Sequence, residues 1–316
     1  EDTGSFDILI SGSNDGPTLT TGAVDPSLSE DGDASSQSFI DTGTITFADL
    51  DDTVLITAGS PTITPSEGVS VPSELSTILS SAFTVTDNSD NTASWSISAS
   101  NMDLDFLGAG ETVTIDLIVT ATDDQSASVE DTISFVITGT NDAPTVSMSG
   151  NTSTASIAEL ADASSQTLSA SGSINFDDLD ANDDLTITTT SIVVSSVGAS
   201  VSSELEADLI AAVSVSESLD TDGQADWSLS TAGLDLDYLD TGESIAVTIA
   251  ITATDLSNES VTTNAVVTIT GTNDGPTLSV EAVDPTVDKA VDASTQSLSD
   301  SGTIYFSDLD DNATIT

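Results

Sequence analysis

The chain has 316 residues, of which 54 are acidic and only Lys289 is basic, so its formal net charge is −53 at pH 7. A polyanion of this kind repels nucleic acid and anionic lipid, which makes both poor partners and makes cations the natural ligands. Cysteine is absent, so no disulfide can form, and no apolar run approaches the ~18 residues of a membrane-spanning helix.

One eight-residue motif occurs three times along the chain. It is Ile-Ser-Gly-Ser-Asn-Asp-Gly-Pro at 10–17, Ile-Thr-Gly-Thr-Asn-Asp-Ala-Pro at 137–144 and Ile-Thr-Gly-Thr-Asn-Asp-Gly-Pro at 269–276. Gly allows a positive φ, Asn and Asp side chains cap turns, and Pro ends strand pairing. We therefore predict joints between folded units at these three places, with the oxygens of the Asn-Asp pair available as cation ligands.

The domains expected from these joints form a tandem array. Residues 1–13 are predicted to be the last strand of a preceding repeat, 14–140 and 141–272 two complete β-sandwich repeats, and 273–316 the start of a third. Both ends of the chain then fall inside domains, so we expect this sequence to be part of a longer protein. A Phe-x-Asp-Leu-Asp segment that recurs at 47–51, 176–180 and 306–310 supports the repeat.

Alternation of apolar and polar residues dominates each repeat. It is clearest at 112–122, 132–138 and 244–254, where apolar side chains would face inward and Thr side chains outward. Several such runs predict an all-β fold of tandem antiparallel β-sandwiches. One short helix per repeat is expected, at 203–213, where Ser203 and Glu206 have capping-box spacing, and at its counterpart 72–83.

Carboxylates gather beside the joints. Two carboxylates ~5 Å apart repel by about 3 kcal/mol at an effective dielectric constant of 20. Groups such as Asp49, Asp51 and Asp52 would be costly to hold together without a cation, because neither complete repeat has a Lys or Arg. The same holds for Asp178, Asp180, Asp183 and Asp184. Ca²⁺ takes six to eight oxygen ligands and suits such groups, whereas the plain alternative is a solvated acidic loop that serves solubility.

The acidic loops at 87–90 and 220–223 are candidates for local Ca²⁺ binding, but turn chemistry explains their composition equally well.

Four motifs in a fixed order resemble the VCBS repeat of giant bacterial RTX-type surface adhesins. They are Trp-Ser at 95–96 and 227–228, Leu-Asp-x-Leu-x-x-Gly-Glu at 104–111 and 236–243, Thr-Ala-Thr-Asp at 120–123 and 252–255, and the joint motif itself. The VCBS family is similar to cadherins, and the resemblance covers essentially the whole chain. It implies cadherin-like or Ig-like sandwiches in a linear rod, exported by type I secretion to the bacterial cell surface. There they would act in cell adhesion or biofilm as extracellular extender modules that hold an adhesive tip away from the cell, stiffened by Ca²⁺ between repeats.

By resemblance to cadherins, each joint would draw its Ca²⁺ ligands from both repeats and the linker. The joint at 14–17 would use Asn14, Asp15, Asp49, Asp51 and Asp123. The joint at 141–144 would use Glu30, Asp105, Asn141, Asp142, Asp178, Asp180 and Asp255, with Glu111 as a weaker candidate. The joint at 273–276 would use Glu159, Asp237, Asn273, Asp274, Asp308 and Asp310. The third repeat has Lys289 where the first two have Glu30 and Glu159.

Two other classes of function compete with a structural repeat. A Ca²⁺-dependent carbohydrate-binding module would need accessible aromatic side chains, but only 4% of residues are aromatic and Trp95 and Trp227 are expected in the core. An enzyme would have to work without His, Cys or Arg, and every acidic cluster recurs with the repeat, so we predict no enzyme. The expected partners are Ca²⁺ and neighbouring repeats of the same longer chain. Lateral self-association, and a host or surface glycan bound through another part of the protein, are left open.

Overall fold

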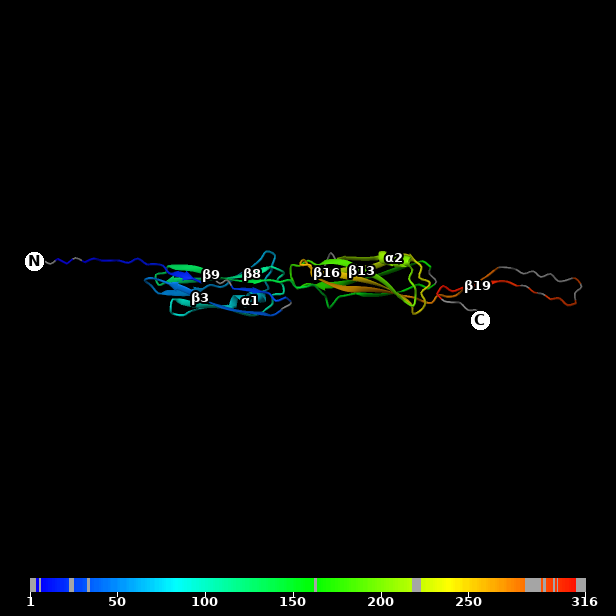
Figure 1. Cartoon of the computed structure of the whole chain (residues 1–316), viewed down its shortest axis with the longest axis horizontal. Helices are drawn as coiled ribbons and strands as arrows, with labels where there is room; N and C mark the ends of the chain where they lie inside the picture. Colours follow the sequence, from blue (N-terminus) through cyan, green and yellow to red (C-terminus); the bar gives the residue numbers. More distant parts are fainter. Residues whose placement is uncertain are drawn as a thin grey trace. The chain divides into compact units, whose positions relative to one another are not determined.

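The computed structural model describes residues 4–5, 7–22, 26–32, 35–161, 164–217, 223–281, 291, 294–297, 299 and 301–310. Lys289 and residues 218–222 lie outside these described residues. The chain forms two compact units, which we call unit 1 (Glu1–Ala143 with Asp178–Asp183) and unit 2 (Pro144–Asp177 with Asp184–Thr316) (Figure 1). No helix among the described residues is both long and apolar enough to cross a membrane.

Unit 1 is a β-sandwich of two sheets. The first has the order β1-β3-β7-β6, formed by Thr18–Thr20, Gln37–Ala48, Thr92–Met102 and Phe83–Asp87. The second has the order β2-β9-β8-β4, formed by Ser27–Ser29, Ser128–Thr138, Thr112–Asp123 and Val54–Ala58, and β5 (Thr62–Pro65) also pairs with β8. Pairing is antiparallel except between β2 and β9, which run parallel.

Unit 2 repeats this topology. Its first sheet has the order β10-β12-β15-β14, formed by Thr145–Val146, Gln166–Asp177, Gln224–Leu234 and Val213–Glu217. Its second has the order β11-β17-β16-β13, formed by Thr154–Ala158, Ser260–Thr270, Ser244–Thr254 and Thr186–Val197, with β11 parallel to β17. A separate hairpin pairs β18 (Thr277–Val280) with β19 (Ile304–Ser307). The prediction of tandem antiparallel β-sandwiches is confirmed.

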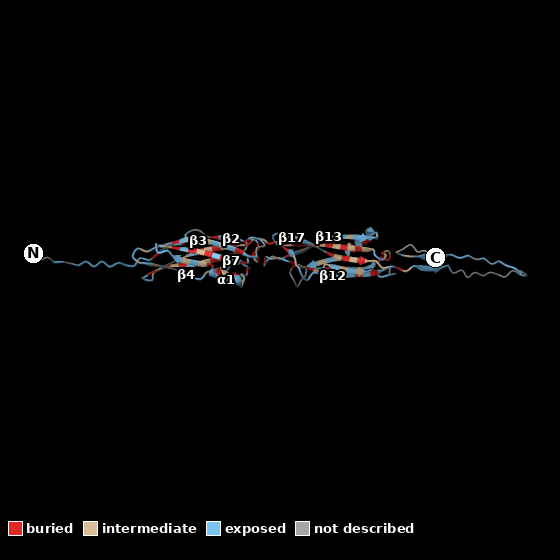
Figure 2. Ribbon diagram, turned by 90° about the horizontal axis from the view of Figure 1, so that it is seen from below, coloured by how far each residue is buried: buried red, intermediate tan, exposed pale blue. Residues whose placement is uncertain are grey.

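The predicted alternation produces the two cores. In β8 the inward residues Val113, Ile115, Leu117, Val119 and Ala121 are at most 1% exposed, and in β16 the equivalent residues are fully buried. Figure 2 shows the buried positions alternating with exposed ones along the strands. The sheets meet through side chains such as Phe39 and Phe135, whose rings stack with centroids 4.5 Å apart.

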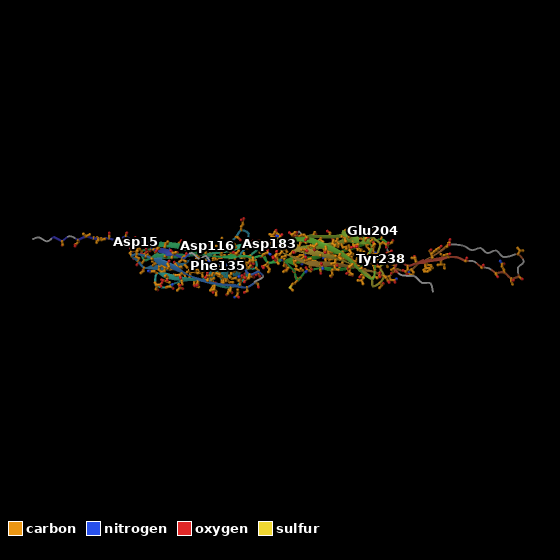
Figure 3. The ribbon with its side chains drawn as sticks, viewed as in Figure 1. Asp15, Asp116, Phe135, Asp183, Glu204 and Tyr238 are labelled. Atoms are coloured by element: carbon orange, nitrogen blue, oxygen red, sulfur yellow. The ribbon has the colours of Figure 1, made fainter. Side chains whose placement is uncertain are left out.

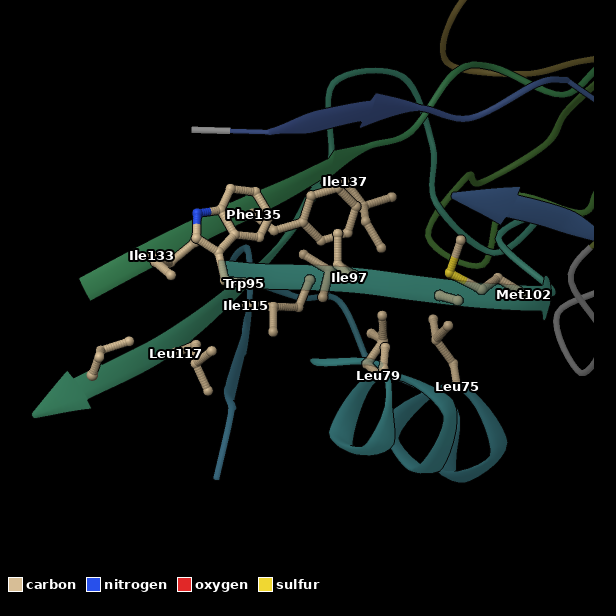
Figure 4. Packing of buried hydrophobic residues seen from close by; sticks show 14 of the residues in the cluster. Leu75, Leu79, Trp95, Ile97, Met102, Ile115, Leu117, Ile133, Phe135 and Ile137 are labelled. Atoms are coloured by element: carbon tan, nitrogen blue, oxygen red, sulfur yellow. The ribbon is translucent and has the colours of Figure 1, made fainter. Parts of the chain in front are cut away.

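Each unit has one short helix, as predicted. Helix α1 (Ser73–Ser81) and helix α2 (Ser203–Ala211) bury Leu75 and Leu79, and Leu205 and Leu209. Figure 4 shows Leu75 and Leu79 pointing from α1 toward the strand that carries Ile97 and Met102.

Helix α2 begins at Ser203, as predicted, but the capping residue that the spacing of Ser203 and Glu206 suggested is wrong by one position. The N-cap is Ser202, whose hydroxyl accepts a hydrogen bond from the Leu205 backbone N–H at 3.1 Å, whereas Ser203 is already inside the helix. Val213, predicted to be its last residue, instead begins β14.

Trp95 and Trp227 lie in the two cores, as predicted, at 3% and 1% exposure. Each indole covers a glycine on the neighbouring strand, Gly43 or Gly172, where a Cβ atom would collide with the ring. Glycine is required there because the indole occupies the space that a side chain would fill.

The predicted strand at residues 1–13 stays a prediction. The described residues from 7 to 13 form no strand, and Ile8, Leu9 and Ile10 are largely exposed. The repeat boundaries and the linear rod likewise stay predictions.

Candidate metal centre

The joint motif leaves β9 and β17 through a glycine packed against backbone. The Gly139 N–H donates to Glu111 O at 2.8 Å and Gly139 O accepts from the Gly110 N–H at 3.1 Å. A Cβ at Gly139 would collide with the carbonyl oxygens of Leu107 and Gly108, and Gly271 is enclosed in the same way. Neither glycine has a positive φ, so the conformational role expected for them is wrong. They are needed because two backbone segments approach each other closely.

Parallel pairing carries Glu30 to this joint. Glu30 follows β2, and its backbone N–H donates to Thr138 O at 2.9 Å, continuing the pairing with β9. Its Oε2 then accepts the Thr140 backbone N–H at 3.0 Å. The side chain is 3% exposed, so this carboxylate lies in the interior beside the linker.

Three further carboxylates surround Glu30. One carboxylate oxygen each from Glu30, Asp105 and Asp142 lies within 4.8 Å of the other two, and all three residues are buried. The Asp142 backbone N–H donates to Oδ2 of Asp180 at 2.9 Å, and Asp180 is 2% exposed. Asp178 supports this turn by accepting the Asp180 backbone N–H at 3.0 Å. The structure therefore brings Glu30, Asp105, Asp142 and Asp180 together within unit 1.

The electrostatics of this cluster favour a cation. Burial, reinforced by Asp142, Asp180 and Asp105, raises the pKa of Glu30 to about 8, against the lowering effect of the Thr140 N–H. Burial also raises the pKa of Asp180 to about 7, with contributions from the charges of Asp142 and neighbouring aspartates. Within the described part of the chain, Glu30 Oε1 and Asp180 Oδ1 are buried and accept no hydrogen bond. These oxygens point to a ligand that supplies positive charge.

Unit 2 repeats the arrangement with equivalent residues, although Asp310 is only partly buried where Asp180 is buried. One oxygen each from the buried Glu159, Asp237 and Asp274 lies within 4.8 Å of the others. Glu159 follows β11, and its Oε2 accepts the Thr272 backbone N–H at 2.9 Å. The Asp274 N–H donates to Asp310 Oδ2, also at 2.9 Å. Burial, with the charges of Asp274 and Asp237, raises the pKa of Glu159.

The first joint shows part of the same pattern. The Asn14 side-chain amide donates to Asp123 Oδ2 at 2.9 Å, and the Asp15 backbone N–H reaches both carboxylate oxygens of Asp51 at 3.3 and 3.4 Å. Asp49 accepts the backbone N–H of Asp51 at 3.1 Å. The contact between a linker Asp N–H and the last Asp of Phe-x-Asp-Leu-Asp thus occurs at all three joints.

The remaining predicted ligands have other environments. The amides of Asn141 and Asn273 donate to the carbonyl oxygens of the next residue at 2.8 and 2.6 Å, which fixes both side chains at the joint. Asp255 lies in the turn after β16, belongs to unit 2 and accepts the Glu259 N–H at 2.8 Å, so its role at 141–144 stays a prediction. Asp308 precedes Asp310 in the turn after β19. The weaker candidate Glu111 accepts hydrogen bonds from Gly108 N and Asn182 Nδ2, so its carboxylate holds the loop together.

Sequence reasoning missed two glutamines that position the glutamates. Gln37, buried in β3, accepts the Asp31 N–H at 3.2 Å and donates to Ser29 O at 2.9 Å, so it holds the residues on both sides of Glu30. Gln166 is 3% exposed and accepts the Leu160 N–H at 3.0 Å, next to Glu159. The signal was present, because Ser-x-Gln recurs at 35–37, 164–166 and 294–296.

Comparisons with known proteins give cadherin domains as structural neighbours. A scan against protein-family models found no match, and neither did a search of curated proteins. The Protocadherin GammaB4 extracellular domain is 15% identical over 87% of this chain and 36% of its own length, with a TM-score of 0.36. Zebrafish RET cadherin-like domains 1 to 4 are 12% identical over 82% of this chain and 51% of theirs, with a TM-score of 0.27. Protocadherin Gamma B2 extracellular cadherin domains 1–5 are 14% identical over 82% and 40%, with a TM-score of 0.35. The chain therefore spans about half or less of the length of these proteins.

Proposed function

We propose that the chain is a run of Ca²⁺-binding β-sandwich repeats that act as a structural extender of an extracellular, bacterial surface adhesin of the VCBS type. The observation that carries the proposal is the duplicated cluster of buried carboxylates, Glu30 with Asp105 and Asp142, and Glu159 with Asp237 and Asp274. Ionised carboxylates are costly to bury without a compensating charge, and neither complete repeat, 14–140 or 141–272, contains a Lys or Arg.

Calcium is the cation that this donor set suits best. Ca²⁺ accepts six to eight oxygens in flexible geometry at about 2.3–2.6 Å, whereas Mg²⁺ demands a near-ideal octahedron and retains several waters. Four carboxylates from four separate segments, those of Glu30, Asp105, Asp142 and Asp180, together offer up to eight oxygen ligands. Soft metals prefer thiolate or imidazole, which a chain without Cys and His cannot offer.

The mechanical part of the proposal follows from where the ligands lie. Glu30 and Asp105 belong to the sandwich, Asp142 to the linker and Asp180 to the segment beyond it. A cation held by all four would tie the linker to the sandwich, so the joint would stiffen when Ca²⁺ binds. Without the ion, repulsion between the carboxylates would loosen it. Such a chain would be pliable in a cytosol poor in Ca²⁺, during export, and rigid outside the cell.

Thermal unfolding of the full chain in Ca²⁺ and in chelator tests Ca²⁺ binding. Extracellular modules bind Ca²⁺ with dissociation constants of about 10⁻⁴–10⁻³ M. At 100 times the dissociation constant, one site adds roughly 2.7 kcal/mol, so chelation should lower the melting temperature clearly. Asp142→Asn should remove most of this gain in unit 1. Glu130→Gln, which neutralises an exposed carboxylate on β9, should keep it. If chelation changes nothing, or both variants respond alike, the acidity serves solubility alone.

Small-angle scattering tests the extender role. A strand of 11 residues such as β9 is about 37 Å long at ~3.4 Å per residue, so each repeat should advance a rod by about 40–45 Å. We expect the maximum dimension of the full chain to fall on chelation and to recover with Ca²⁺. An unchanged scattering curve, alongside a Ca²⁺-dependent melting temperature, would leave Ca²⁺ binding standing and refute the stiffening.

A further inference from the structure

One sheet of unit 2 is free of charge in a chain that carries 54 carboxylates. Strands β11, β17, β16 and β13 contain no Asp, Glu, Lys or Arg. Carboxylates lie at the strand ends, as with Glu243 before β16 and Asp255 after it, and on helix α2, which carries Glu204, Glu206 and Asp208 and contacts β13. At ~3.4 Å per residue, the middle of an 11-residue strand is about 17 Å from either end. This exceeds the Debye length of about 8 Å at physiological salt, so the charges at the strand ends are largely screened at the middle of the sheet.

The matching sheet of unit 1 differs at equivalent positions. Asp116, labelled in Figure 3, lies on β8 and pairs with Ser134 and Thr62. Its register equivalent Thr248 pairs with Val266 and Val193. β9 also carries Glu130 and Asp131, where β17 has Thr residues. The charge-free surface is therefore a property of unit 2 and is not required by the fold.

Strand β13 forms the edge of this uncharged sheet. It has 12 residues, pairs only with β16 among the described strands, and is largely exposed along its length (Figure 2). Residues 185–203, which contain it, form the longest stretch of the chain without a charged residue. A long uncharged edge presents a row of backbone N–H and C=O groups that can pair with another strand.

The equivalent sheet edge of unit 1 is interrupted. There β4 and β5 are separate strands of five and four residues, interrupted by Gly59, Ser60 and Pro61, and β5 ends at Pro65. Proline has no N–H to donate, and a broken edge cannot offer a continuous ladder. In unit 2 the interruption is reduced to a register shift between Thr189 and Ser191, which leaves residues 191–197 in unbroken pairing with β16.

We propose that residues 191–197 of β13 pair antiparallel with the same strand of a second copy of this chain. Charge selects this partner. A basic partner would be drawn to the carboxylates elsewhere on the molecule, whereas another polyanion can approach closely only where carboxylates are absent. The outward row Ser191, Val193, Ser195 and Val197 is small and β-branched, with Val193 54% and Val197 67% exposed. Such residues make favourable cross-strand neighbours when the strand meets itself about a two-fold axis.

Sedimentation equilibrium of the full chain in Ca²⁺ and ~150 mM salt tests this pairing through a matched pair of variants. Val193→Glu/Ser195→Glu places charges on the open edge. Thr62→Glu/Thr64→Glu places them at the register-equivalent positions of unit 1, since Thr62 and Thr64 pair with Asp116 and Thr114 as Val193 and Ser195 pair with Thr248 and Ala246. We expect a monomer–dimer equilibrium that the first variant weakens at least about tenfold and the second leaves unchanged. A monomeric wild-type chain at all concentrations, or equal weakening by both variants, would overturn the proposal.

Cysteine crosslinking gives an independent measurement that does not depend on charge. The chain has no cysteine, so a single Ser195→Cys or Val193→Cys substitution introduces the only thiol. Opposed antiparallel residues have Cα atoms about 4.5–5.5 Å apart, within the range of a disulfide. Pairing of 191–197 with itself places Val193 of one copy opposite Ser195 of the other. Under mild oxidation we therefore expect an equimolar mixture of the Val193→Cys and Ser195→Cys variants to form a covalent dimer about tenfold faster than the Thr64→Cys control. Equal rates at β13 and β5 would refute edge pairing and assign the association to another surface.

Discussion

Units 1 and 2 agree closely inside and differ outside. Val113 to Ala121 in β8 and Ile245 to Ala253 in β16 occupy the same buried row, and Glu30 and Glu159 accept the same linker N–H from Thr140 and Thr272. Their outer surfaces share no such rule, because one carries Asp116 and Glu130 where the other carries threonines. The comparison teaches that core packing and the carboxylate cluster restrict which residues can occupy the buried positions. The solvent-exposed positions are not restricted in this way, so the two units can differ there in charge and in binding.

The largest expected effect comes from breaking the shared core. Leu117→Ala and Ile249→Ala remove equivalent side chains that are at most 1% exposed, and each should cost about 2–5 kcal/mol through lost burial and a residual cavity. The loss should be confined to the mutated unit. Urea unfolding can be followed by the one tryptophan of each unit, Trp95 or Trp227, with the other replaced by Phe. A loss of similar size in both units would show that they do not unfold independently.

An intermediate effect should come from the pH dependence of the ion-free chain. The pKa of Glu30 rises on folding from 4.5 to about 8, so the folded state binds a proton that the unfolded state has released. The resulting stabilisation is complete below pH 4.5 and is lost as pH rises through about 8. In chelator, unit 1 should lose on the order of 2 kcal/mol between pH 5 and pH 8, and Glu30→Gln should flatten this slope.

The same pH measurement sharpens the comparison between the two carboxylate clusters. Burial raises the pKa of Glu159 in the same direction, so Glu159→Gln should flatten the slope of unit 2 and leave unit 1 unchanged. Glu130→Gln, at an exposed position, should alter neither slope. The effect of Glu30→Gln on the free energy of unfolding should depend on Ca²⁺. In chelator the substitution removes a repulsion and should stabilise unit 1 at neutral pH, whereas in Ca²⁺ it removes a ligand and should destabilise it. A variant that destabilises equally in Ca²⁺ and in chelator would argue against a metal site at Glu30.

The smallest expected effect concerns the helices, where the units differ locally. Helix α2 has a side-chain cap from Ser202, whereas α1 begins after Pro72 and has none. Ser202→Ala should cost unit 2 about 0.5–2 kcal/mol, and Ser203→Ala, inside the helix, should cost much less. Chemical denaturation of the two variants measures the difference. If the two substitutions lowered the free energy of unfolding equally, Ser202 would not be the dominant cap, and Ser203, which the capping-box spacing favoured, would share that role.

Periodicity made the fold predictable, and recurrence made the candidate site predictable. Alternation fixed which face of β8, β9 and β16 is buried, because a strand that is wet on one side cannot vary that pattern freely. Asp142 and Asp180 could be nominated from their repeated spacing. The role of Gly139 could not, because it depends on a close approach to the 107–108 loop, which is more than 30 residues away in sequence. Gln37 recurs within Ser-x-Gln, but recurrence alone does not show that its amide holds the residues on both sides of Glu30. The uncharged sheet could not be predicted either, because its four strands are spread between residues 154 and 270 and form one surface only on folding.

The parallel pairing beside the joints at 141–144 and 273–276 has a consequence for how the protein should respond to force. Because β2 runs parallel to β9, and β11 to β17, tension applied to the two ends of a repeat pulls each such pair along its length in opposite directions. All the hydrogen bonds of the pair are then strained at once and must break together, whereas an antiparallel hairpin pulled from its open end can unzip one bond at a time. The clamp in unit 2 extends over five residue pairs from Thr154 to Ala158, and that in unit 1 over three from Ser27 to Ser29. Under rising tension, unit 1 should therefore rupture first and unit 2 should hold longest.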